Sequence, residues 1–125
     1  MDTIQKIFIA VGAFNGALAV LAGAFSAHGL ESQISAERLD TFHTAARYQM
    51  YHSIALLLTA GAISVMNSGL PKISGWLFIA GMLLFSGSLY LLVLTDTPWL
   101  GAITPLGGLA LISGWILLGI SPFKG

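Results

Sequence analysis

The sequence contains no cysteine, which excludes disulfides, thiolate metal sites and cysteine-bound iron–sulfur clusters. Charge is also scarce, since charged residues make up 8% of the chain and five basic residues balance five acidic ones. Without a basic excess there is no electrostatic footprint for nucleic acid, and we expect no nucleic-acid partner.

Apolar residues fill the space that charges leave, at 56% of the chain. They form uncharged runs that are long enough as helices to cross the roughly 30 Å hydrocarbon core of a bilayer. The composition predicts an all-α integral membrane protein, with residues 1–125 as a single membrane domain in contact with membrane lipids. We predict a four-transmembrane-helix bundle with spans at about 5–27, 47–66, 73–94 and 101–121.

The first connection, residues 28–46, differs from the other two because it holds many of the charges. Ser35 is a suitable helix cap, and Glu37 would place a negative charge in the first turn. Neither proline nor glycine interrupts residues 35–60. This connection is therefore predicted to be an amphipathic polar helix that runs, straight or bent, into the second span.

Small residues recur at helix-packing intervals in the first and last spans. The spacing of two residues three or four positions apart brings them onto one helix face, where a neighbouring helix can approach closely. We expect such helix packing at Gly12, Gly16, Gly23, Gly107 and Gly114.

Basic residues predict the orientation. Lys6, Lys72 and Lys124 fall on one side of the predicted membrane, and Arg38 and Arg47 fall on the other. The side with more basic residues is expected to face the cytoplasm. We predict a multi-pass protein of the bacterial inner (plasma) membrane with both termini in the cytoplasm.

A candidate polar cluster lies where the second span begins. Ionisable residues inside a membrane are candidates for function by default. Two interpretations stay open, because the tyrosines also fit an aromatic belt and His52 with Gln49 could link the second helix to the first. The candidate binding residues are His28, Arg47, Tyr48, Gln49 and His52.

A metal centre at the three histidines is not favoured. In a continuous helix His43 and His52 point to opposite sides, because nine residues at about 100° each make two and a half turns. His28 and His52 would still need a third ligand. We therefore predict no metal site, no other cofactor and no catalytic residue.

Four motifs in order resemble one family of small membrane proteins. The motifs are Gly23-Ala-Phe-Ser-Ala-His-Gly-Leu30, Thr44-Ala-Ala-Arg-Tyr-Gln-Met-Tyr-His52, Gly87-Ser-Leu-Tyr90 and Gly101-Ala-Ile-Thr-Pro-Leu-Gly-Gly108, followed by Gly114-Trp115. They resemble the YgdD-type family over essentially the whole chain, with Ser26 standing where that pattern usually has glycine. The resemblance implies a four-helix inner-membrane protein of unknown activity. The family motifs include His28, Tyr48, Gln49, His52, Thr104 and Pro105.

Two functions from different classes fit the sequence. The first is a protein that is not an enzyme and acts as a packed unit, a homo-oligomer or an accessory subunit of a larger membrane complex. The second is a small channel or transporter with a polar vestibule lined by His28, Gln49 and His52. The spans contain no deep acidic or basic residue, which favours the first.

Overall fold

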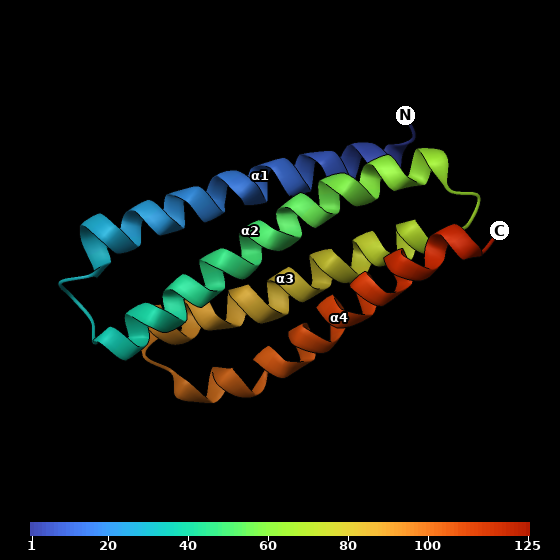
Figure 1. Cartoon of the computed structure of the whole chain (residues 1–125). Coiled ribbons are helices and arrows are strands. Elements are labelled where there is room, and N and C mark those ends of the chain that lie inside the picture. The colour runs from blue at the N-terminus through green and yellow to red at the C-terminus, as the bar shows by residue number, and fades with distance from the viewer.

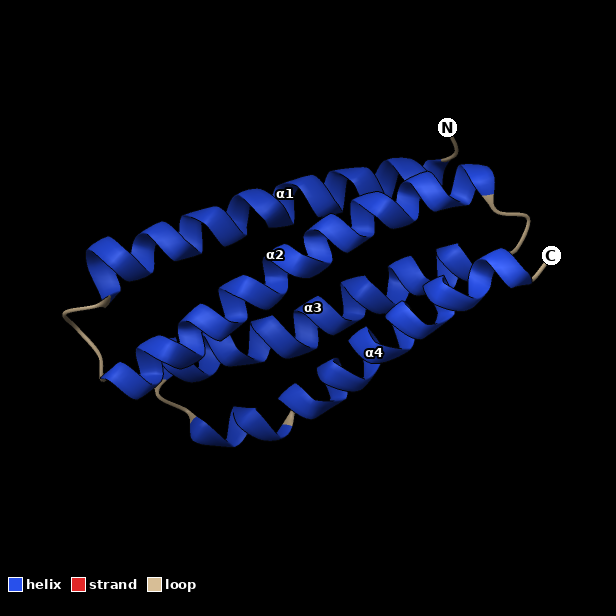
Figure 2. Cartoon of the chain, in the orientation of Figure 1, coloured by secondary structure: helices blue, strands red, loops and turns tan.

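A computed structural model describes all residues, 1–125, as helices joined by short loops, with no strand (Figures 1 and 2). The long helices are α1 (Thr3–Phe25), α2 (Ala36–Val65), α3 (Leu70–Thr95) and α4 (Thr104–Ile120). A π-helical turn, η1 (Ser26–Leu30), extends α1, and two 3-10 turns, η2 (Pro98–Ala102) and η3 (Ser121–Phe123), flank α4.

Local chemistry explains where the helices begin. The Asp2 side chain accepts from the Gln5 backbone N–H at 2.8 Å, and the Gln5 side chain accepts from the Asp2 N–H at 3.0 Å. The bond from Gln5 also lowers the pKa of the Asp2 carboxyl below its ordinary value. Ser35 caps α2 as expected, and Pro105 lies in the first turn of α4, where its missing N–H costs nothing.

Three helical segments are apolar and long enough to span a membrane: Thr3–Leu30, Leu70–Thr95 and Pro98–Phe123. The remaining predicted span, 47–66, is the second in the chain and forms part of α2. This helix is not apolar enough to count as a fourth membrane-spanning segment. The predicted polar helix runs into the second predicted span without a break, because from Ala36 onward it is the first part of the continuous α2.

The four long helices lie in a row in chain order (Figure 1), and the predicted four-transmembrane-helix bundle is supported only as an all-helical chain with three apolar segments. Each long helix packs mainly against its neighbours in the chain, so α1 and α4 are the two edges. Burial follows this order, because α2 and α3 bury ten residues each, whereas α1 buries four and α4 three. The middle helices can be covered on two sides, and the edge helices on one.

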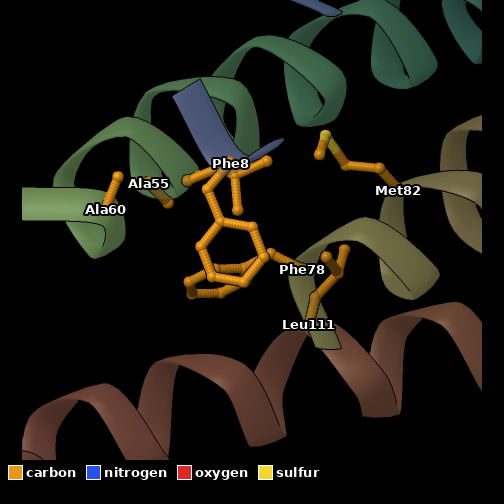
Figure 3. Close-up of a cluster of buried hydrophobic side chains, with 7 residues drawn as sticks. Phe8, Ala55, Ala60, Phe78, Met82 and Leu111 are labelled. Carbon is orange, nitrogen blue, oxygen red and sulfur yellow. The ribbon is translucent and has the colours of Figure 1, made fainter. Parts of the chain in front are cut away.

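The main core contains side chains from all four helices. Phe8 of α1 and Phe78 of α3 are fully buried at its centre, and Leu111 of α4 covers them from the other edge (Figure 3). A smaller cluster of Leu30, Phe42 and Val93 lies toward the η1 end of the row.

Glycines decide how closely the helices approach. A Cβ on Gly107 would overlap the backbone of α3 at Leu84 and Phe85, and one on Gly114 would lie 2.8 Å from the Phe78 ring. At Gly12 a Cβ would lie 3.0 Å from the Ser53 carbonyl oxygen. These three glycines lie at close helix contacts.

The other two predicted packing glycines differ from these. A Cβ on Gly16 would make only ordinary contacts, with Ser53 Cβ at 3.9 Å. Nothing lies within 4 Å of such an atom on Gly23, so Gly23 does not pack against a neighbouring helix of this chain. The sequence spacing marks the face of a helix but not where along it a neighbour crosses.

The α3–α4 contact should be sensitive to one methyl group. We expect Gly107→Ala to lower the free energy of unfolding by about 1–3 kcal/mol, because the clash is with backbone that cannot rotate away. Gly119→Ala, on the same helix with open space around it, should leave stability unchanged or raise it by up to about 1 kcal/mol. Unfolding in mixed detergent micelles measures both, and equal effects would contradict the close contact.

Candidate functional site

Gln49, in the middle of α2, joins three helices through its side chain. Its Oε1 accepts a hydrogen bond from the Tyr90 hydroxyl of α3 at 2.7 Å, and its Nε2 donates to Asn15 Oδ1 of α1 at 2.9 Å. Asn15 in turn donates to the Val11 carbonyl at 2.9 Å. Gln49 is buried, so these partners replace the water that its amide has lost.

Asn15 does not bond to the serines of α3. Ser86 instead donates to the Ala45 carbonyl at 2.8 Å, and Ser88 pairs with Thr104 at 2.6 Å. The row explains this, because α2 lies between α1 and most of α3.

His52 joins α2 to α4. Its Nδ1 lies 2.7 Å from the Tyr48 carbonyl oxygen, which can only accept, so Nδ1 carries the proton. Nε2 then accepts from the Trp115 indole N–H at 3.0 Å. The sequence expectation of a link to the first helix is wrong for His52, and it is right for Gln49.

The remaining predicted residues are scattered. Arg47 is exposed and donates to the Thr44 hydroxyl at 3.4 Å, and Tyr48 stacks on Phe85 of α3 with ring centroids 4.7 Å apart. His28 is exposed in η1 and makes no side-chain hydrogen bond.

His43 makes a contact that sequence reasoning missed. The Ser26 hydroxyl donates to the Gly23 carbonyl at 2.7 Å, so it is free to accept from His43 Nε2 at 2.9 Å. This bond joins the π-helical turn η1 to α2. The substitution of serine for glycine at position 26 was visible in the sequence, but its partner was not.

Arg38 is a second contact that the sequence did not predict. Its guanidinium donates to the Val93 carbonyl of α3, and its Nε lies 3.9 Å from the Asp96 carboxylate. A cation at this place also offsets the partial negative charge at the C-terminal end of α3. Arg38 therefore ties the start of α2 to the end of α3.

Gln49 and His52 line two different cavities. The first, about 260 Å³, is lined by residues of α1 and α3 together with Gln49 of α2. Its polar lining comes from Asn15, Gln49, Ser86 and Tyr90. The second, about 540 Å³, is lined by residues of α2 and α4 together with Phe85 of α3. Its lining is Tyr48, Tyr51, His52, Phe85, Gly108, Leu111, Ile112 and Trp115. The two share no lining residue and neither includes His28, so the predicted vestibule of His28, Gln49 and His52 is not formed.

The buried hydroxyls of α2 bond to their own helix. Ser53 donates to the Gln49 carbonyl and Thr59 to the Ala55 carbonyl, both at 2.7 Å. No three histidine, aspartate or glutamate side chains gather closely enough to hold a metal ion. The arrangement supplies hydrogen bonds that link the helices, together with the two cavities described above.

A family model described as "Protein of unknown function (DUF423)" matches residues 22–108. This chain belongs to the DUF423 family. Its relatives include the "UPF0382 membrane protein SAB0533" of Staphylococcus aureus (strain bovine RF122 / ET3-1), 51% identical over 120 residues that cover 96% of this chain and 98% of the relative. The "UPF0382 membrane protein YwdK" of Bacillus subtilis (strain 168) is 47% identical over 121 residues, with the same coverage. No solved structure matches the chain.

DUF423 membership confirms a membrane protein from a family of unknown function. The narrower YgdD-type name stays a prediction, because neither the family model nor these relatives carry it. The region matched to the DUF423 model contains Gln49, His52 and Tyr90, whereas Asn15 and Trp115 lie outside it.

The bond between Gln49 and Tyr90 of this DUF423 chain can be measured with a double-mutant cycle. We expect Gln49→Leu and Tyr90→Phe to be coupled by about 0.5–1.5 kcal/mol in the free energy of unfolding, the range for hydrogen bonds between membrane helices. Tyr51→Phe is the matched control, because the exposed Tyr51 hydroxyl makes no bond in the chain. Additive effects of Gln49→Leu and Tyr90→Phe would contradict the bond.

Proposed function

We propose that this protein is a non-catalytic building unit of the membrane, which associates with further copies of itself or with a larger membrane assembly. One observation carries the proposal. The polar groups of Gln49 and His52 are used to hold neighbouring helices together, while large apolar side chains remain uncovered on both edge helices. Such a unit offers surfaces for packing and no activated group for chemistry.

We propose further that all four long helices cross the membrane. The bonds of Gln49 and His52 fix the middle of α2 beside α1, α3 and α4, and three of these segments are apolar enough to span. Within the predicted span 47–66, Gln49, His52, Ser53 and Thr59 are buried inside the chain, so they lower the mean hydropathy of α2 without exposing their polar groups to lipid.

The orientation predicted from the basic residues becomes part of the proposal. Both termini lie at the same end of the row, where Lys72 pairs with Asp2 at 3.4 Å (Figure 1). Arg38 lies near the opposite end, at the last turn of α3. With Lys6 and Lys124 also at the termini, the positive-inside rule supports a plasma-membrane protein with cytoplasmic termini.

The outer edge of α1 supports association between copies. Its exposed positions include a series of alanines at helical spacing, Ala10, Ala13, Ala17 and Ala24. Small residues at such spacing let two membrane helices approach closely, and a contact between identical edges closes into a two-fold dimer.

Cysteine cross-linking tests the edge directly, because the natural chain has no cysteine. We expect Ala13→Cys and Ala17→Cys to form disulfide-linked dimers in membranes under mild oxidation. Leu109→Cys, on the exposed edge of α4, is the matched control and should cross-link several-fold less. Equal cross-linking at both edges, or none at either, would overturn association through α1.

A channel or carrier is the second candidate, favoured by the cavity of about 260 Å³ beside Asn15 and Gln49. The polar lining of this cavity comes from Asn15, Gln49, Ser86 and Tyr90 and contains no histidine, so a path through it should conduct equally well between pH 5 and 8. We expect reconstituted protein to give proton and potassium fluxes no larger than those of protein-free liposomes across that range. A protein-dependent flux that Gln49→Leu abolishes would replace the building-unit proposal with the channel.

A further inference from the structure

The cavity between α2 and α4 is not used by the function proposed above. It has a volume of about 540 Å³, which lies within the range of small-molecule sites. Leu111 and Ile112 of α4 supply aliphatic lining, and Gly108 leaves room where a side chain would otherwise stand. The row is one helix thick here, so the cavity lies on a face that the chain itself does not cover.

Aromatic rings dominate the lining, since five of the eight lining residues carry one. Tyr48 is stacked on Phe85 at 4.7 Å and lies 5.7 Å from the Tyr51 ring, while His52 and Trp115 meet edge to face at 5.9 Å. Such walls favour a flat ring, which can stack or meet their edges, over a flexible acyl chain.

The cavity also carries unused hydrogen-bond donors. The hydroxyls of Tyr48 and Tyr51 make no hydrogen bond within the chain, and both side chains are exposed. The ring nitrogens of His52 and the Trp115 indole, by contrast, are already bonded. The cavity can therefore donate from phenols to an oxygen on a ligand without breaking any bond between its helices.

The position of the cavity adds a second requirement. Gly108 lies near the middle of the apolar segment Pro98–Phe123, Tyr48 lies beside Gln49 in the middle of α2, and Trp115 lies two turns further along α4 than Gly108. With all four helices spanning as proposed above, a phenol hydroxyl without a partner at this depth favours a ligand that brings an acceptor oxygen, and the surrounding lipid favours an apolar tail. A matching ligand has a polar ring at one end and an apolar tail at the other.

We propose that this cavity binds a lipid-soluble quinone or quinol, which is a six-membered ring with carbonyl or hydroxyl oxygens and an apolar tail. The ring lies among Tyr48, Phe85 and Trp115, its oxygens accept from the tyrosine hydroxyls, and the tail leaves along Ile112 into the bilayer. The proposal concerns binding, with no electron transfer.

Tryptophan fluorescence in nanodiscs tests the site, with a benzoquinone carrying a decyl tail as the probe. A Trp76→Phe/Trp99→Phe background leaves Trp115 as the sole tryptophan, and neither removed side chain lines the cavity. We expect saturable quenching that Gly108→Leu weakens at least tenfold. Gly108→Leu should fold, because its Cβ would meet only the Phe85 ring at 3.9 Å.

Gly119→Leu is the matched control, on the same helix with open space and outside the cavity, and it should quench as the background does. Ile112→Trp blocks the cavity from an exposed lining position, and it replaces Gly108→Leu should that variant fail to fold. Quenching that is non-saturable, or equal in the blocked and control variants, would overturn the site.

Two further arms test the ligand class. Tyr48→Phe/Tyr51→Phe should weaken binding about three- to tenfold, the value of one or two hydrogen bonds. Decanol, which has the tail without the ring, should not displace the probe at equal concentration. Displacement by decanol, or full binding without the hydroxyls, would show a general acyl-chain site and overturn the assignment to quinones.

Discussion

Gln49 lies in the middle of α2 and bonds to the helices on both sides of it, and the rest of the row depends on that bond pair. An amide in an apolar layer must find partners or lose the stability that burial supplies. Asn15 and Tyr90 fit the two ends of the amide, one as acceptor and one as donor. One amide thereby links α2 to a different helix at each of its two ends.

Other polar side chains also link helices elsewhere along the row. His52 and Trp115 join α2 to α4, Ser26 and His43 join the π-helical turn to α2, and Arg38 joins α2 to the carbonyl end of α3. All of these links involve α2. Gln49 and His52, two of the polar residues that make α2 less apolar than the other long helices, thus bond it to all three of them.

The sequence predicted the helices better than their arrangement. Uncharged runs located the three apolar spans, and Ser35 marked the start of α2, because length and capping are local properties. Whether the helices close into a bundle depends on which faces meet across the chain. Gly75 illustrates the limit, since its role is to admit the Phe8 ring, and nothing near it in sequence indicates that partner.

The sequence predicted the candidate site only in part, because it does not indicate which residues of other helices a side chain meets. Gln49 and His52 stand out because polar residues in an apolar run are rare, but their partners Tyr90 and Trp115 are ordinary residues for a membrane helix end. A period of 3.6 residues places Gln49 and His52 on adjacent sides of α2 without indicating that one faces α1 and the other α4. Tryptophan is common near the ends of membrane helices, so the hydrogen bond of Trp115 could not be predicted from its position alone.

A row one helix thick has consequences for its surroundings. Large apolar side chains of the three apolar helices α1, α3 and α4 stay exposed on the surface of the chain, so in a membrane acyl chains supply the packing that a second layer of helices supplies in a thicker protein. Bilayer thickness and chain order thereby act on the interior of this protein as well as on its rim. Its conformational stability becomes a joint property of the polypeptide and the surrounding lipid.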